Sequence, residues 1–125
     1  MQVLADTSVW INHLRSPDPE LQTYLEDGIV LMHPCVSGEL ALGTLKNRSE
    51  ILRLFSKLPP TEIATNAEVL HLIEAKKLWG VGIGWVDAHL LAATLLTQYC
   101  HLWTHDVRLR QACDKAGSPV IRRPS

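Results

Sequence analysis

The sequence has no excess of basic residues, no long apolar run and no paired cysteine motif. Its 12 Lys and Arg residues stand against 13 Asp and Glu residues, which gives a formal net charge of −1. This balance does not indicate a protein that binds nucleic acid through a strongly basic surface. The most apolar stretch, 90–96, contains a threonine and is far shorter than the roughly 20 residues of a membrane span. We therefore expect no contact with a membrane.

The cysteines and the N-terminal segment bear on the cellular compartment. Cys35, Cys100 and Cys113 are odd in number and widely spaced, whereas a disulfide framework needs an even set in a short secreted chain. We expect reduced thiols that are mostly packed inside the protein. The N-terminal segment has no basic region and reaches Asp6 before an apolar leader develops. These features favour a cytoplasmic protein.

The overall composition of the chain is that of a globular domain. The chain has 125 residues, of which 46% are apolar and 20% charged. These values are ordinary for a folded protein and too apolar for a disordered one. We expect a single domain over residues 1–125.

Short apolar segments alternate with amphipathic ones along the chain. We expect strands at 3–5, 29–32 and 101–104, a weak one at 62–64 and a last short one at 119–121. Helices are expected after Asp6-Thr7-Ser8 up to Leu14, from Pro19 to Gly28, from Ser37 to Leu42, and at 48–58, 66–79, 85–99 and 106–116. We expect Asn66 to cap its helix, and the helix 85–99 to be buried at the centre. This order predicts an α/β sandwich with a mainly parallel sheet.

Four acidic residues fall where a parallel sheet places its functional sites, beyond the carboxyl ends of the strands. Asp6 follows the first strand and Asp106 follows the strand at 101–104. Glu39 lies on the helix entered from the second strand. Asp87 lies in the first turn of the buried helix, directly after the glycine loop 80–84. We expect the four carboxylates to converge at one edge of the sheet.

The surroundings of these acids suggest a metal site. Each lies in an apolar segment, where carboxylates are rarely buried unless they are paired or bound to a cation. Clustered carboxylates raise one another's pKa by repulsion, and a divalent cation relieves it. Oxygen-only ligands favour Mg²⁺ or Mn²⁺ over zinc.

Each acid also has a purely structural interpretation. Asp6 and Asp106 are suited to cap helices, Asp87 favours the N-terminal end of a helix dipole, and Glu39 is suited to a solvated helix face. Taken singly, these interpretations are at least as good as the functional one. Taken together, four acids at one predicted edge favour the metal site.

The order and local sequence of these acids resemble a known family, the PIN-domain nucleases, and in particular the VapC-type ribonuclease toxins of toxin–antitoxin modules. The resemblance extends from Val3 to about Ile121. It is carried by Asp6-Thr7-Ser8 with Trp10, by Ser37-Gly38-Glu39-Leu40, by Gly84-x-x-Asp87-x-x-Leu90-Leu91-Ala92-Ala93, and by Leu102-Trp103-Thr104-His105-Asp106. It implies a PIN-like three-layer α/β/α sandwich with a mainly parallel central sheet.

The resemblance also implies a set of site residues. Asp6, Glu39, Asp87 and Asp106 would form the Mg²⁺ (or Mn²⁺) site, and Thr104, together with Thr7 or Ser8, would orient the carboxylates. Many relatives carry a further acid shortly after the last aspartate, followed by Phe, but this chain has Val107-Arg108-Leu109. Whether the site holds one metal or two therefore stays open.

The implied activity is hydrolysis of RNA phosphodiester bonds, with Glu39 or Asp106 positioning the attacking water. Single-stranded or loop RNA is the expected substrate, since it can enter a narrow cleft. Candidate contacts to RNA phosphates are the basic residues Arg108, Arg110, Arg122, Arg123, Lys46 and Arg48. If four of the 13 acids are committed to a metal, basic groups outnumber the remaining acids.

The resemblance further implies a homodimer and a VapB-type antitoxin that blocks the site. Apolar helix faces suited to these contacts lie around Leu52, Leu54 and Phe55, or around Leu70 and Ile73.

Two other functions fit parts of the sequence. A catalytically inactive PIN-like module would bind RNA or antitoxin, but such a module has no need to maintain four repelling acids. A receiver-like phosphoacceptor domain would use Asp6 and Asp106 with a metal, but it needs a lysine late in the chain that is not convincingly placed. Metal-dependent cleavage of RNA separates the first alternative from the nuclease.

Overall fold

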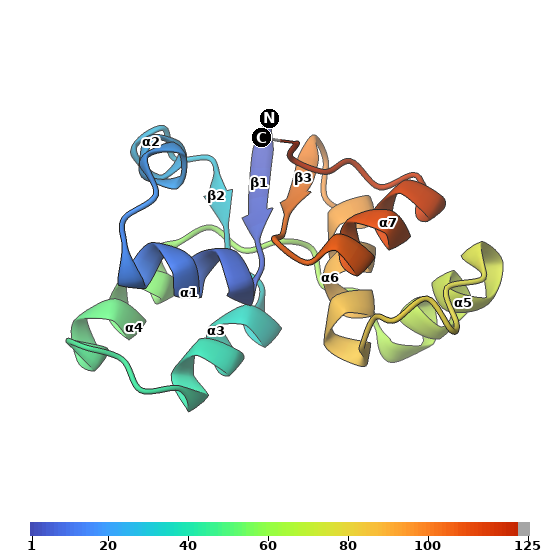
Figure 1. Cartoon of the computed structure of the whole chain (residues 1–125), viewed down its shortest axis with the longest axis horizontal. Helices are drawn as coiled ribbons and strands as arrows, with labels where there is room; N and C mark the ends of the chain where they lie inside the picture. Colours follow the sequence, from blue (N-terminus) through green and yellow to red (C-terminus); the bar gives the residue numbers. More distant parts are fainter. Residues whose placement is uncertain (123–125) are drawn as a thin grey trace.

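A parallel sheet lies at the centre of the computed structural model, which describes residues 1–122. Its strands are β1 (Gln2–Ala5), β2 (Val30–Leu31) and β3 (Cys100–Trp103), in the order β2-β1-β3. β1 pairs in parallel with both neighbours, so that Val3 lies opposite Val30 on one side and His101 on the other. The carboxyl ends of all three strands point the same way (Figure 1).

Seven helices enclose this sheet within the described residues. They are α1 (Thr7–Arg15), α2 (Pro19–Glu26), α3 (Pro34–Leu42), α4 (Arg48–Lys57), α5 (Asn66–Lys76), α6 (Trp85–Leu96) and α7 (Val107–Ala116). α1 to α4 lie on one side of the sheet and α5 to α7 on the other (Figure 1). The expected three-layer α/β/α sandwich with a parallel sheet is confirmed.

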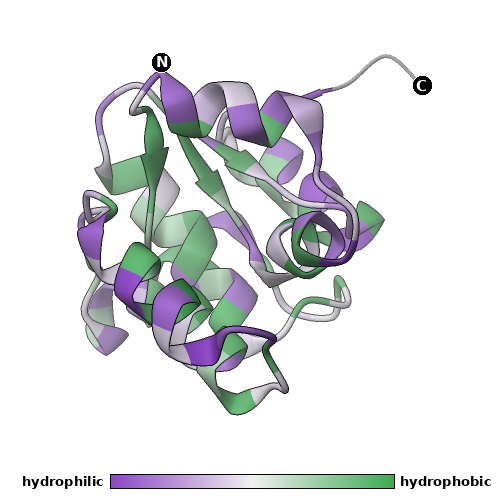
Figure 2. Cartoon of the chain, turned by 90° about the vertical axis from the view of Figure 1, so that its left-hand side faces the viewer, coloured by the Kyte–Doolittle hydropathy of each residue, from purple (hydrophilic) through white to green (hydrophobic). Residues whose placement is uncertain are grey.

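The core forms where the apolar strands meet the apolar faces of the helices. Val3, Leu4 and Ala5 are fully buried, as are the side chains of Trp10 and Trp103. α6 is buried continuously from residue 88 to residue 94, as expected of the central helix. Figure 2 shows the hydrophobic strands between helices whose outer surfaces are more hydrophilic. Within residues 1–122, no helix is both long and apolar enough to cross a membrane.

Several helix boundaries differ from the sequence-based expectation. α3 begins at Pro34 rather than Ser37, because His33 caps it by accepting a hydrogen bond from the Cys35 backbone N–H at Nδ1 (3.0 Å). The cap of α5 is Thr65, which forms a capping box with Glu68, so the expectation for Asn66 was wrong.

The C-terminal ends of two helices also come earlier than expected. α5 stops at Lys76 rather than at 79, since Lys77 adopts a left-handed conformation. α6 stops at Leu96 rather than at 99, because Thr97 is extended and its hydroxyl donates a hydrogen bond to the Ala93 carbonyl.

Of the two remaining strands predicted, the one at 62–64 is wrong, and the one at 119–121 is reduced to a single parallel bridge beside β3. Residues 62–64 form no strand, and the sheet instead gains a single bridge between Met32 and Pro60. The backbone N–H of Glu62 donates to the Thr97 hydroxyl (3.0 Å) and not to a strand. At the other edge, only Val120 forms a bridge, to Leu102. The strand predicted at 29–32 is shortened to 30–31, and the strand predicted at 101–104 is shifted to 100–103.

Candidate active site

Asp6 lies at the carboxyl end of β1 and is 5% exposed. Its backbone N–H donates to the Trp103 carbonyl (2.9 Å), which joins the ends of β1 and β3. Its Oδ1 accepts hydrogen bonds from the Val9 N–H (3.1 Å) and from the Ser8 hydroxyl (2.5 Å). Asp6 is thus the N-cap of α1, and both bonds use the same oxygen.

Asp106 repeats this arrangement after β3. It caps α7, and its Oδ1 accepts from the N–H groups of Arg108 (2.8 Å) and Leu109 (3.3 Å). Its own N–H donates to the Thr104 hydroxyl (3.0 Å). Both aspartates therefore act as helix caps, which was one of the two interpretations of each, and each caps with one carboxylate oxygen only.

Glu39 reaches this edge of the sheet from α3. The Thr7 hydroxyl donates to its Oε1 (2.7 Å), which connects α3 to the first residue of α1. The rest of the Glu39 side chain is exposed. The hydrogen bond therefore holds an exposed carboxylate beside the residue that follows Asp6.

Asp87 provides evidence that the four acids share one electrostatic environment. It lies in the first turn of α6, and its Oδ2 accepts from the Gly84 N–H (3.3 Å). Burial raises the pKa of Asp87, the Gly84 hydrogen bond opposes this rise, and the charges of Asp106, Asp6 and Glu39 raise the pKa further. Three other elements of the chain thus bring Asp6, Glu39 and Asp106 within electrostatic reach of Asp87.

The donor chemistry of this group suits a hard divalent cation. Each of the four acids directs one oxygen to a protein hydrogen bond, and its second oxygen receives none from residues 1–122. Oxygen-only donors are those that Mg²⁺ prefers, and a cation would offset the repulsion that raises the pKa of Asp87. No three carboxylate, histidine or thiol groups of the described chain already form a closed metal-binding cluster. Binding would therefore require the acidic side chains to close around the ion.

The three hydroxyl residues predicted to support the acids contact them in different ways. Thr7 and Ser8 donate directly to the carboxylates of Glu39 and Asp6. Ser8 also accepts from the His105 N–H (3.2 Å), which ties the segment after β1 to the segment after β3. Thr104 accepts from a backbone N–H and so positions the main chain of Asp106 rather than its carboxylate.

Arg108 lies beside the site for a reason that sequence reasoning missed. A Cβ atom added to Gly82 would lie 2.6 Å from Cδ and 3.1 Å from Nη1 of Arg108. Gly82, at φ +85°, therefore leaves the space that the arginine occupies. The only signal for this contact in the sequence is the Gly-x-Gly-x-Gly spacing at 80–84.

The other basic residues predicted to contact RNA differ in how far their side chains are already bound or buried. Arg110 is half-buried on α7. Arg122 forms an ion pair with Asp114, and Arg48 donates to the Gly43 carbonyl (3.2 Å). Lys46 lines a cleft of about 720 Å³ that ends at Glu39. Arg123 lies outside the described residues.

The cysteines take no part in this site. All three are free; Cys100 and Cys113 are buried and Cys35 is half-buried, so the expectation that the thiols are mostly packed is confirmed. Burial raises the pKa of Cys100 to about 11 and that of Cys113 to about 12. These two thiols are therefore protonated at neutral pH and are not nucleophiles.

Comparison with known proteins gives the family. No family model matches the chain. The chain is 45% identical over 123 residues to Ribonuclease VapC32 of Mycobacterium tuberculosis (strain CDC 1551 / Oshkosh), and the match covers 98% of this chain and 99% of that protein. Ribonuclease VapC32 of the strain ATCC 25618 / H37Rv gives the same values. This identity over nearly the full length of both proteins, on a parallel α/β/α sandwich, shows that the chain belongs to the VapC-type ribonucleases of the PIN-domain family.

Proposed function

We propose that this protein is a Mg²⁺-dependent endoribonuclease that hydrolyses RNA phosphodiester bonds and acts as the toxin of a VapBC-type module. The observation that carries the proposal is a group of four carboxylates, three of which raise the pKa of the fourth, Asp87, and each of which has one oxygen left without a protein donor. Asp6, Glu39, Asp87 and Asp106 would hold the ion. When bound, Mg²⁺ supplies the charge that polarises the scissile phosphodiester and lowers the pKa of the attacking water.

Glu39 is the better of the two acids proposed to position that water. It is exposed and makes one hydrogen bond, to the Thr7 hydroxyl, so its second oxygen is available to accept a proton of the water. Asp106 is committed more firmly, because one of its oxygens holds two N–H groups of α7. Thr7 is a positioning residue in this scheme, since it sets the orientation of the Glu39 carboxylate.

The RNA backbone would be held by Arg108, Arg110 and Arg122. Arg108 is best placed, because it is exposed in the first turn of α7, two residues after Asp106. Arg122 contributes only if it leaves Asp114. Contacts of this kind make RNA binding weaken as the salt concentration rises.

The test is cleavage of a broad RNA pool by wild-type protein with Mg²⁺, with a chelator, and by Asp6→Asn. Asparagine caps helices as well as aspartate, so this variant keeps the fold while it loses the charge. We expect cleavage only by the wild type with Mg²⁺. Full activity in chelator, or in both Asp6→Asn and Asp87→Asn, contradicts the mechanism. No cleavage of any RNA would instead favour an inactive binding module.

The remaining expectations for this protein are also proposals. We propose one PIN-like domain over residues 1–125, a cytoplasmic location, a homodimer and a VapB-type antitoxin. Leu54 and Leu70 are 45% and 56% exposed, which suits protein contacts, whereas Phe55 is 3% exposed and belongs to the core. Relief of growth arrest by co-expression of a small upstream reading frame tests the antitoxin, and analytical ultracentrifugation tests the dimer.

A further inference from the structure

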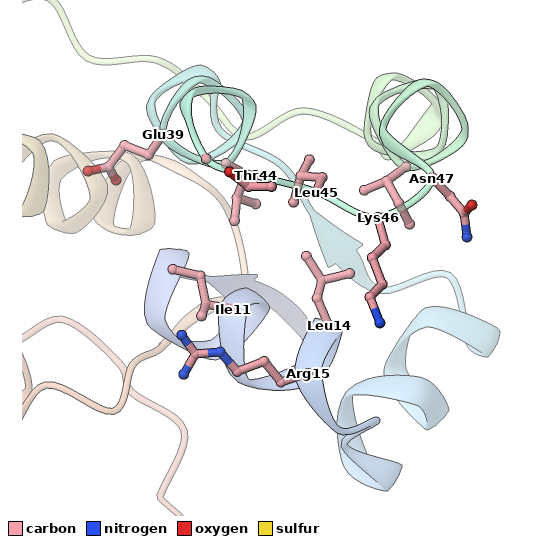
Figure 3. A pocket seen from close by; sticks show the side chains of 11 residues that line it. Ile11, Leu14, Arg15, Glu39, Thr44, Leu45, Lys46 and Asn47 are labelled. Carbon is pink, nitrogen blue, oxygen red and sulfur yellow. The ribbon is translucent and has the colours of Figure 1, made fainter.

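A cleft of about 720 Å³ opens between α1 and the loop 43–47, and Glu39 lies at one end of it. Figure 3 shows Ile11, Leu14 and Arg15 of α1 on one wall and Thr44, Leu45 and Lys46 on the other. The volume is within the range of small-molecule binding sites, roughly 300–1,000 Å³. The cleft is therefore a candidate binding site that shares Glu39 with the proposed active site.

Two apolar side chains of α1 are left uncovered in the cleft. Ile11 is 41% exposed and Leu14 is 37% exposed, although both are large and apolar. Contiguous exposed apolar side chains beside a catalytic group commonly contact a ligand. A flat apolar ligand group would be protected from water against these two residues.

Two cations flank the same apolar surface. Neither Arg15 nor Lys46 forms an ion pair with any residue between 1 and 122, where the one ion pair joins Arg122 and Asp114. In Figure 3 the Arg15 guanidinium lies on the Glu39 side of the cleft, and Lys46 enters from the opposite wall. Two unneutralised cations at separate points along a cleft suit a ligand that carries repeated negative charges.

The cleft is also lined by polar side chains that form no hydrogen bond to residues 1–122. Asn47 is the N-cap residue of α4, but at φ 53° its side chain makes no capping hydrogen bond. Asparagine usually caps in this position, so its amide here keeps a free donor and a free acceptor. The Thr44 hydroxyl also forms no hydrogen bond to the described chain, although it lines the cleft. These are the groups with which proteins read the edges of unpaired bases.

We propose that the cleft is a subsite for an unpaired nucleotide of the RNA, next to the phosphodiester that is cleaved. Arg15 and Lys46 bind phosphates, Ile11 and Leu14 contact the face of the base, and Asn47 reads its edge. The proposal rests on the proposed nuclease function, because the cleft shares Glu39 with the proposed active site, and the two cations without ion pairs favour RNA over a protein segment as the occupant.

Binding of labelled single-stranded RNA to Asp6→Asn protein in chelator tests the subsite without cleavage. In that background we expect Arg15→Ala with Lys46→Ala to weaken binding about tenfold and to reduce the salt slope by about 1.4, the value for two lost single-strand phosphate contacts. The matched control is Lys76→Ala, which removes an exposed cation from a separate groove of about 510 Å³ between α5 and α6. We expect the control to bind like the parent.

A second measurement concerns specificity. We expect Asn47→Ala to lose the nucleotide preference at one position beside the cut, as read by sequencing the product ends from a random RNA pool. Because both cations are exposed, thermal unfolding of the double variant should match that of the parent, whereas Asn47→Ala should lower the Tm slightly, since alanine is strained at the φ of 53° that Asn47 adopts.

The outcomes separate the subsite from the function on which it rests. If the double variant keeps the parental affinity and salt slope while wild-type protein cleaves RNA, the subsite is wrong and the nuclease function stands. If wild-type protein cleaves no RNA, the nuclease function is wrong, whereas loss of RNA binding by the double variant still supports the cleft as an RNA site. If the variant binds RNA normally but no longer binds a co-expressed antitoxin, the cleft is a protein-docking site and the proposal is overturned.

Discussion

Replacing Gly82 by alanine is expected to impair RNA cleavage by displacing Arg108. The added Cβ would lie 2.6 Å from the Arg108 Cδ and 3.2 Å from its Nε, so the arginine side chain must leave its place. Gly80 provides a matched control, because it also has a positive φ (+70°) but no atom lies within 4 Å of an added Cβ. The two alanine variants therefore share the backbone strain and differ in the contact.

The backbone strain and the displacement of Arg108 are expected to affect different quantities, the first the stability and the second the cleavage rate. Alanine at a positive φ costs about 1 kcal/mol, which lowers the Tm of a chain of this length by roughly 3–6 °C in both variants. Moving an exposed, flexible arginine adds little to that cost. If Arg108 donates a charge-assisted hydrogen bond to an RNA phosphate, its displacement loses about 1.5–3 kcal/mol, or about 10- to 100-fold in kcat/KM.

Steady-state cleavage and thermal unfolding of four variants measure these effects. We expect Gly82→Ala and Arg108→Ala to lose activity to a similar extent, and Gly80→Ala to keep it. Adding Gly82→Ala to Arg108→Ala should lower the Tm but cause no further loss of activity. Equal activity of the two glycine variants would show that the place of Arg108 does not matter for cleavage, and so would a further loss of activity when Gly82→Ala is added to Arg108→Ala.

Two further predictions concern the supports of the site. Thr7→Val removes the hydroxyl that donates to Glu39 (2.7 Å), so kcat should fall about tenfold with little change in Tm. Thr7→Ser keeps a hydroxyl and should keep the wild-type kcat. An unchanged kcat in Thr7→Val contradicts the positioning role. Burial lowers the pKa of His33 below 6.5, and the charge of His89 lowers it further by a smaller amount. Protons therefore bind the unfolded chain preferentially, so the free energy of unfolding falls as the pH drops below 6.5. His33→Asn keeps a capping side chain and should reduce this fall in Tm between pH 7 and 5; an identical pH profile would show that His33 is not its cause.

The sequence predicted the parts of the fold that depend on local patterns. The apolar run before Asp6 became β1, and Asp6 and Asp106 occupy the strand ends where they were expected. Parallel topology then explains why acids far apart in sequence come within electrostatic reach, as the raised pKa of Asp87 reflects.

The features that sequence reasoning missed depend on tertiary contacts. No local pattern shows that His33 caps α3, because histidine is not a typical capping residue. The approach of Arg108 to Gly82 joins residues 26 positions apart, and the cleft beside Glu39 requires the packing of α1 against α3. The strand expected at 62–64 is absent because the Glu62 N–H donates to the Thr97 hydroxyl, a contact between residues 35 positions apart.

Calorimetric titration of Mn²⁺ into the wild-type protein, Asp6→Asn and Asp87→Asn is the sharpest test of a metal site built from the four carboxylates. Both substitutions keep a side-chain oxygen for the existing hydrogen bonds while they remove one of the four charges. Glu74→Gln removes an exposed acid of α5 and serves as the control. We expect one Mn²⁺ site that is filled in the wild type and in the control, and that binds Mn²⁺ at least about tenfold more weakly in each aspartate variant. Unchanged Mn²⁺ affinity in both aspartate variants would contradict a metal site built from these carboxylates.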